Sequence, residues 1–171
     1  MDALFSPWRF SYLIQESPPP GCVFCIAHRR PDDDADDNLI VHRARFNFVI
    51  LNLYPYNNGH LMVVPNAHLA TPGDSDPQQR AEMIELAMEC ERILRANFRP
   101  DGFNVGMNLG RAAGAGIAEH FHMHVVPRWS GDTNFMTVMA GTRVIPQDLR
   151  ETRELLRAGF RAGDDGSRGQ V

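Results

Sequence analysis

The sequence has no long apolar run, few cysteines and no excess of positive charge, and each absence excludes a class of protein. No stretch of the 171 residues approaches the roughly 18 apolar residues of a membrane span, so we expect no membrane partner. Three cysteines are too few for a secreted disulfide framework. A net charge of −4 and a pI of 5.9 argue against a nucleic-acid partner. The N-terminal segment also lacks the apolar core of a signal peptide, so we expect a cytoplasmic protein.

What remains is the composition of one globular domain. Hydrophobic residues make up 43% of the chain, and 171 residues suit a single domain. We expect this domain to span residues 1–162, with residues 1–38 as an irregular N-terminal arm, and residues 163–171 to form a disordered tail. The negative charges in the acidic run 31–37 repel one another, which predicts a solvated loop within the arm.

Hydrophobic patterning predicts an α+β fold with an antiparallel sheet of about five strands and two main helices. The strand-like segments are residues 39–42, 46–51, 60–64, 102–108 and 119–127. Helical spacing covers residues 77–98 and 146–160, and Asp76-Pro77 supplies a cap and a first-turn proline for the longer helix. Cys90 falls inside that helix and is expected to be a small buried apolar residue.

Three of the seven histidines, His120, His122 and His124, occupy alternate positions in the run 119–127. A β-strand points every second side chain to the same face, so the run predicts three imidazoles on one surface, spaced roughly 6–7 Å apart. The apolar residues between them would then point into the core.

Three chemical interpretations of these histidines compete. In the first they bind a catalytic zinc ion, which takes three protein nitrogens and a water. In the second one of them is a nucleophile or general base that its neighbours orient. In the third they are polar residues on a hydrated sheet face, which their regular spacing disfavours. The outer two lie roughly 13 Å apart on ideal strand spacing, so at most two neighbours readily share one ion.

The glycine-rich segment 109–118 directly precedes the histidine run. Glycines let successive backbone N–H groups converge on an anion without a Cβ in the way. A glycine loop alone is a weak signal, but beside an imidazole nucleophile it suggests phosphoryl or nucleotidyl transfer.

The run His120-Phe-His122-Met-His124-Val-Val resembles the signature of the histidine-triad (HIT) superfamily. Asn52 and residues 59–68 resemble the first nucleotide-contacting segment of that family, and residues 5–9 and 22–25 resemble the arm of its longer bacterial members. Residues 129–136 resemble the segment after the triad in the diadenosine tetraphosphate phosphorylase branch. The resemblance implies a HIT-like fold and a homodimer, or higher oligomer, whose sheets continue across the interface.

The resemblance also assigns roles to individual residues. It implies that His122 attacks the α-phosphate of a nucleotide and forms a nucleotidyl-histidine intermediate, while His124 contacts the phosphate and His60 supports the triad. Asn52 would hydrogen-bond the nucleoside. The residues expected along the phosphates are Asn108 and loop 110–117, with Gly114, Gly116 and Ile117. An unperturbed imidazole pKa near 6.5 leaves a neutral nitrogen for attack at pH 7.

One departure from the family pattern lies before the triad. Many members carry glutamine and then serine or threonine at positions 116 and 117, where this chain has Gly116 and Ile117. The hydroxyl that would assist the leaving group is therefore missing. This argues against the simple hydrolase mechanism and favours an acceptor other than water.

Cys22 and Cys25 form half of a familiar structural zinc site, although their spacing also allows a redox pair. The arm does not resemble the βαβ setting of a redox motif. In zinc-bearing HIT proteins two such cysteines join two histidines, and the matching positions here are His68 and His120. The resemblance thus implies a structural zinc site that occupies His120 and leaves His122 available.

The function expected from the resemblance is nucleotidyl transfer on dinucleoside polyphosphates, with phosphorolysis of diadenosine tetraphosphate to ATP and ADP as the leading activity. The expected partners are an adenine nucleotide or dinucleoside polyphosphate and inorganic phosphate. The alternatives are a HIT-type hydrolase of dinucleoside polyphosphates or nucleoside phosphoramidates, a zinc-dependent hydrolase, and a nucleotide-binding regulator without turnover.

Overall fold

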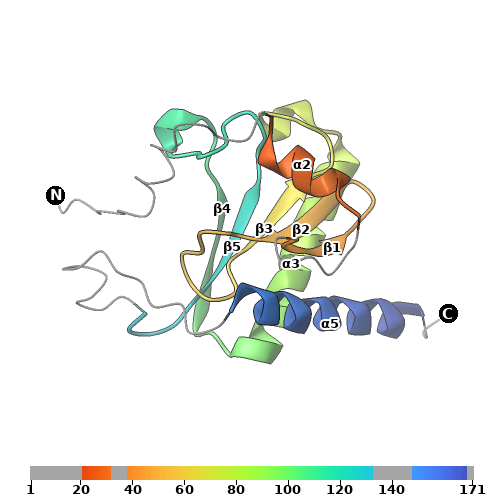
Figure 1. Ribbon diagram of the computed structural model, residues 1–171, viewed down its shortest axis with the longest axis vertical. Coiled ribbons are helices and arrows are strands. Elements are labelled where there is room, and N and C mark those ends of the chain that lie inside the picture. Colours follow the sequence, from red (N-terminus) through yellow and green to blue (C-terminus); the bar gives the residue numbers. More distant parts are fainter. Residues whose placement is uncertain (1–20, 32–37, 133–147, 169–171) are drawn as a thin grey trace.

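A computed structural model describes residues 21–31, 38–132 and 148–168, with side chains as far as residue 163. Its centre is the predicted five-stranded antiparallel sheet, and its strand order is β1-β2-β3-β5-β4 (Figure 1). The strands are β1 (Ile40–Arg43), β2 (Asn47–Leu51), β3 (Leu61–Pro65), β4 (Gly102–Met107) and β5 (Met123–Arg128). The helices are α2 (Val23–Arg29), α3 (Pro77–Phe98) and α5 (Leu149–Arg168), with short 3-10 turns η1 (Pro72–Asp74) and η2 (Arg111–Ala113).

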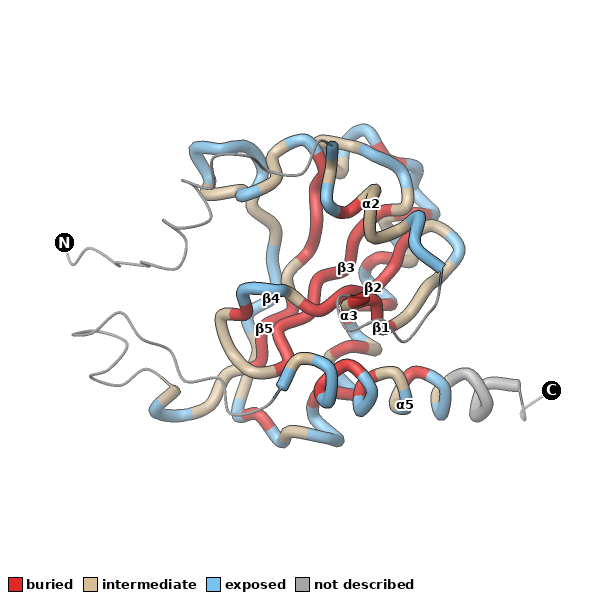
Figure 2. The backbone as a smooth tube through the Cα atoms, in the orientation of Figure 1, coloured by how far each residue is buried: buried red, intermediate tan, exposed pale blue. Residues whose placement is uncertain are grey.

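The two central strands β2 and β3 are buried along their whole length because both faces of the sheet are covered (Figure 2). Alternate side chains point to opposite faces, so Val49 and Leu51 pack toward α3 in the larger core. Phe48 and Ile50 pack with Phe24 of α2 in a second, smaller core. The histidine run therefore adjoins a sheet whose two faces are each packed against a hydrophobic core.

Helix α3 begins as the sequence predicts. The Asp76 side chain accepts a hydrogen bond from the Gln78 N–H at 2.7 Å, and Pro77 occupies the first turn. Cys90 is fully buried, as expected. Ile84 and Met88, on the outer side of the helix, are about half exposed at 49% and 48%.

Helix α5 lies along the β1 edge of the sheet. The fully buried Arg153 donates to the Asn38 carbonyl, and Arg157 Nε donates to the Ile40 carbonyl at 2.9 Å. Two arginines one turn apart thus satisfy backbone acceptors at the start of the edge strand β1 and just before it, which would otherwise stay open to pairing. At the opposite edge, residues 104–106 of β4 are exposed.

Two helices differ from the prediction. Helix α2 lies within the arm that was expected to be irregular; its seven residues, between Gly21 and Pro31, are too few to display helical periodicity. Helix α5 continues to Arg168, past the predicted domain end at residue 162. No helix among the described residues is long and apolar enough to cross a membrane.

Candidate active site and metal centre

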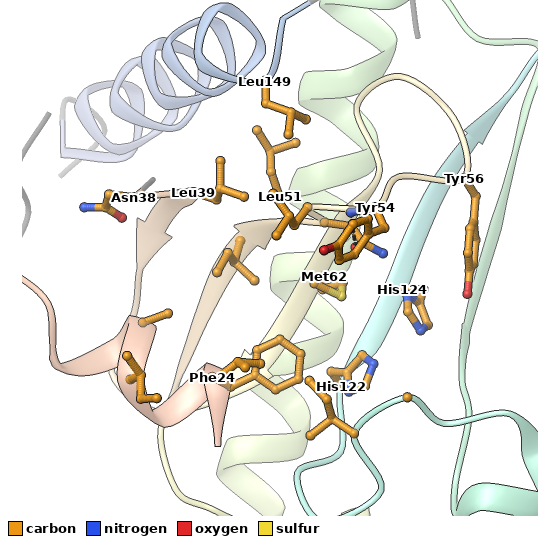
Figure 3. A pocket seen from close by; sticks show the side chains of 18 of the residues that line it. Phe24, Asn38, Leu39, Leu51, Tyr54, Tyr56, Met62, His122, His124 and Leu149 are labelled. Atoms are coloured by element: carbon orange, nitrogen blue, oxygen red, sulfur yellow. Dashed lines mark hydrogen bonds between the residues drawn. The ribbon is translucent and has the colours of Figure 1, made fainter. Parts of the chain in front are cut away.

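A cavity of about 900 Å³ lies on the face of the sheet opposite α3. Its walls come from α2, the β2–β3 region, the loop after β4 and the start of α5. Figure 3 shows His122 and His124 at one end of the cavity, with Asn38 and Leu149 at the other. Most of its lining is apolar, with a few polar groups near the histidines, which is the usual design of a small-molecule pocket.

The strand that carries the histidines begins later than predicted, but the side chains alternate as expected, because Phe121, Met123 and Val125 all point into the larger core. Strand β5 begins only at Met123, and the Phe121 N–H donates to the Leu69 carbonyl at 2.8 Å instead of pairing within the sheet. The chain therefore enters β5 from an extended segment, in which the rings of His120 and His122 both contact Phe24 while His120 lies outside the pocket lining. His122 and His124 do face the pocket, with ring centroids 4.8 Å apart.

The partners of His122 fix which of its nitrogens can react. Its Nδ1 lies 3.0 Å from the His120 carbonyl oxygen, which can only accept, so Nδ1 carries the proton. The lone pair then resides on Nε2. The side chain is 5% exposed, and burial lowers the pKa of His122 from its ordinary value. A neutral imidazole with an available Nε2 lone pair is the form that a nucleophile requires.

A chain of hydrogen bonds fixes His124 in the opposite tautomer. The Tyr56 backbone N–H donates to His60 Nδ1 at 3.0 Å, and the Asn52 amide nitrogen lies 3.3 Å from the same atom. His60 is thereby protonated on Nε2, which donates to His124 Nδ1 at 2.9 Å. His124 then carries its proton on Nε2 and can donate it to a ligand. Sequence reasoning missed Tyr56, whose contribution comes from the backbone and leaves no side-chain signal.

The other expected substrate residues also surround the cavity. Asn52 lines it, and its Oδ1 accepts from the Tyr54 N–H at 3.0 Å. Lining residues from the loop after β4 are Asn108, Gly114, Gly116 and Ile117. Gly114 adopts a φ of 89°, which favours glycine. The Ile117 side chain packs on the smaller core, so at this position the pocket presents an apolar group.

Beside the pocket, Cys22, Cys25, His68 and His120 bring four ligand atoms within 4.8 Å of one another. His120 Nδ1 lies 3.3 Å from Cys22 Sγ, 3.6 Å from Cys25 Sγ and 3.3 Å from His68 Nδ1, and Cys25 Sγ lies 3.4 Å from His68 Nδ1. Tetrahedral zinc would place two nitrogens about 3.3 Å apart and a nitrogen and a sulfur about 3.5 Å apart. The predicted four-residue set therefore fits a single zinc ion.

The surroundings of the cluster support the same fit. The His120 Nε2–H donates to the Pro65 carbonyl at 2.9 Å, which leaves Nδ1 as the lone-pair atom that faces the cluster. Burial, and then the nearby Cys22, raises the pKa of the Cys25 thiol. A bound cation would oppose that effect because zinc binds the thiolate.

A group of hydrogen-bonded polar side chains, which the sequence analysis did not predict, fixes the loop before β3. Asp132 accepts hydrogen bonds from Arg128 Nε at 2.6 Å and from Asn57 Nδ2 at 2.7 Å, and these bonds hold its pKa well below the ordinary value. Asn57 also donates to the Pro127 carbonyl at 3.0 Å. These hydrogen bonds connect the end of β5 to the loop that positions His60.

This geometry agrees with what known proteins show. The family model of the HIT domain matches residues 34–131. The chain belongs to the HIT domain family. The HIT fold expected from the triad is thereby confirmed, and the described sheet is the part of the chain on which the match falls.

Individual relatives add detail. An AP-4-A phosphorylase of Mycobacterium tuberculosis is 42% identical over 164 residues, which cover 91% of this chain and 83% of that protein. A zinc-bound histidine triad family protein from Mycobacterium smegmatis superposes with a TM-score of 0.67 at 29% identity, covering 85% of this chain and 97% of that one. A histidine triad nucleotide-binding protein of Sulfolobus tokodaii has a TM-score of 0.64 at 23% identity over 82% of this chain and 93% of its own, which supports the fold alone.

Proposed function

We propose that this HIT protein is a nucleotidyltransferase that cleaves diadenosine tetraphosphate by phosphorolysis, giving ATP and ADP. The observation that carries the proposal is His122, a buried imidazole that faces the pocket with Nδ1 held by the His120 carbonyl and Nε2 as the lone-pair atom. The name and 42% identity of the mycobacterial AP-4-A phosphorylase support the choice of substrate and reaction. Nucleotide substrates also accord with the cytoplasmic location expected from the sequence.

The first step forms a bond between His122 Nε2 and the α-phosphorus. The bond from that phosphorus to the bridging oxygen breaks, and ATP leaves. The modified imidazole then carries a positive charge, which the hydrogen bond from Nδ1 to the His120 carbonyl stabilises. In the second step an oxygen of inorganic phosphate attacks the phosphorus, the phosphorus–nitrogen bond breaks, and ADP forms while His122 returns to its neutral state.

His124 supplies the hydrogen bond to the reacting phosphate. Its Nε2 proton follows from the chain that begins at the Tyr56 N–H and passes through His60. A fixed donor of this kind costs no reorganisation when charge develops in the transition state. Asn108, Gly114 and Gly116 line the same end of the pocket, where the remaining phosphates would lie.

Zinc at Cys22, Cys25, His68 and His120 is part of the same proposal. The tetrahedral spacing of the four ligand atoms and the zinc-bound relative from M. smegmatis support it. Bound there, zinc would join α2 to the loop after β3 and to the histidine run, which is structural chemistry and leaves catalysis to His122.

Product analysis tests the proposed reaction. The protein is incubated with diadenosine tetraphosphate, with and without inorganic phosphate, and the products are separated by ion-exchange chromatography. We expect ATP and ADP that appear only with phosphate. ATP and AMP formed equally well without phosphate would replace phosphorolysis with hydrolysis, and intact substrate that stays bound would indicate a nucleotide-binding regulator.

A homodimer that continues the sheet is the proposed assembly. Residues 104–106 of β4 are exposed at one edge of the sheet, whereas Arg153 and Arg157 cover acceptors at the β1 edge. The β4 edge is thus the one able to pair with a second copy. Light scattering coupled to size exclusion tests the assembly, and a charged substitution, Val105→Lys, should shift a dimer toward monomer.

A further inference from the structure

We propose that the metal site and the nucleotide pocket are thermodynamically coupled through the first turn of α2, with Phe24 as the positioning residue between them. This inference rests on the proposed function, because it concerns the same pocket. It goes beyond that function by making nucleotide affinity depend on metal occupancy, and metal affinity on nucleotide.

Helix α2 interleaves metal ligands with pocket walls. Cys22 and Cys25 contribute thiol groups to the four-ligand cluster. The side chains beside them in sequence, namely Val23, Phe24, Ile26 and Ala27, line the cavity. Residues 22–27, the N-cap and first turn of α2, therefore belong to both sites at once, and this turn cannot move in one site without moving in the other.

Phe24 makes the contacts that join the two sites. It is 4% exposed, and its ring centroid lies 5.4 Å from that of His120, a member of the metal cluster. The same ring lies 4.9 Å from that of His122, the proposed nucleophile. Figure 3 shows Phe24 and His122 side by side at the pocket wall. Phe24 thus both restricts the His122 ring and shapes the apolar part of the pocket.

The far end of α2 has its own attachments. Arg43 of β1 donates to the carbonyls of His28 and Arg30, each at 2.8 Å. The His28 ring also stacks on Phe48, with centroids 5.4 Å apart. These bonds hold the C-terminal end of the helix without a metal, whereas the first turn is joined to His68 and His120 by the four-ligand cluster. Metal loss should therefore release the turn that carries Phe24 and leave the rest of α2 in place.

Coupling of this kind is reciprocal. If zinc tightens nucleotide binding by a given factor, nucleotide must tighten zinc binding by the same factor. The prediction can then be tested in two independent measurements, neither of which depends on turnover.

The first measurement is the affinity for AMP by calorimetry, on zinc-loaded protein and on protein stripped with a chelator. We expect the dissociation constant to rise roughly tenfold on stripping, within the usual range of coupling between sites. The second is the competition between the zinc-loaded protein and a chromogenic chelator, with and without saturating AMP. AMP should raise the chelator concentration needed for half-removal by the same factor. This second experiment starts from the zinc-loaded protein, so it remains informative if the stripped protein unfolds.

Variants separate coupling from simple structural support. Phe24→Ala retains all four ligands, and we expect it to bind zinc while the AMP affinities with and without zinc become equal. Phe24→Leu restores apolar bulk, so part of the difference between the AMP affinities with and without zinc should return. Glu85→Ala is the control, because Glu85 is an exposed residue of α3 that neither lines the pocket nor belongs to the four-ligand cluster. The ratio of its AMP dissociation constants without and with zinc should stay at that of the unmodified protein.

The outcomes distinguish this inference from the function on which it rests. Equal AMP affinities with and without zinc in the unmodified protein would overturn the coupling and leave the proposed reaction intact. If zinc changed the AMP affinity of Phe24→Ala by the same factor as that of the unmodified protein, the role of Phe24 would be overturned. Absence of AMP binding even with zinc would overturn the proposed function itself.

Discussion

At the scale of single residues, the three histidines of the triad differ in where each proton sits. His120 is protonated on Nε2 by its bond to Pro65, and His122 is protonated on Nδ1 by its bond to His120. His124 takes its proton on Nε2 because His60 donates to Nδ1. In the proposed function, these tautomers let one imidazole offer its lone pair to a metal and one to a substrate phosphorus, while the third offers a hydrogen-bond donor.

These tautomers can be observed directly. In long-range ¹⁵N–¹H correlation spectra of the zinc-loaded protein, we expect His122 to be protonated on Nδ1 and His124 on Nε2. The spectra of His122→Ala and His124→Ala assign the signals. A His122 ring protonated on Nε2 would contradict the account, because that tautomer has no lone pair on the atom proposed to attack.

The residue types of the site could be predicted from sequence, but their orientations could not. The triad and the two cysteines stand out by their spacing, and His68 was found through the resemblance to zinc-bearing HIT proteins. The tautomers depend on the His120 and Pro65 carbonyls and on the Tyr56 N–H, which every residue type supplies equally. Backbone donors and acceptors leave no trace in a sequence pattern.

At the scale of elements, the close approach of α5 to α3 depends on a glycine. A Cβ added at Gly159 would lie 2.6 Å from Cγ2 of Ile93, a β-branched side chain that has little rotamer freedom in a helix. Gly159→Ala should therefore destabilise the protein by about 1–3 kcal/mol, despite the better helix propensity of alanine. Urea denaturation followed by circular dichroism measures the change.

Gly102→Ala serves as the control for this substitution. An added Cβ at Gly102 meets nothing within 4 Å, so the free energy of unfolding should change by less than about 0.5 kcal/mol. Equal effects of the two substitutions would show that steric contact with Ile93 is not what constrains α5.

The elements were predicted well where periodicity is long and poorly where tertiary contacts decide. Strands β1 to β4 and helix α3 lie close to their predicted bounds. The start of β5 was placed too early because alternation of histidines with apolar residues looks the same in a strand and in an extended loop. The burial of Arg153 was equally invisible, since arginine in a helix ordinarily predicts a solvent-facing position.

At the scale of the whole molecule, a structural metal would hold together parts that are far apart in sequence. Its ligands come from α2, the loop after β3 and the histidine run, which are separated by as many as 98 positions. Removal of the metal should lower the melting temperature by about 2–8 °C, because each kcal/mol of lost stability corresponds to about 2–4 °C in a domain of this size and we expect a loss of about 1–2 kcal/mol. Differential scanning calorimetry before and after chelation measures the shift.

Cysteine variants test the same prediction through metal content. Cys25→Ser removes a ligand and should abolish stoichiometric zinc, measured by inductively coupled plasma mass spectrometry. Cys90→Ala, a buried cysteine in the α3 core outside the cluster, should keep its zinc even if it lowers stability. Zinc retained in full by Cys25→Ser would contradict the proposed site.

The central claim is that His122 carries the nucleotidyl group, and trapping that intermediate tests it most directly. The protein is mixed with diadenosine tetraphosphate without inorganic phosphate, quenched within milliseconds at high pH, where phosphohistidine bonds are preserved, and its peptides are analysed by mass spectrometry. The account predicts an added AMP on His122, lost when phosphate is supplied and absent from His122→Ala. An adduct on His124 or another residue, or turnover by His122→Ala at the rate of the unmodified protein, would contradict it.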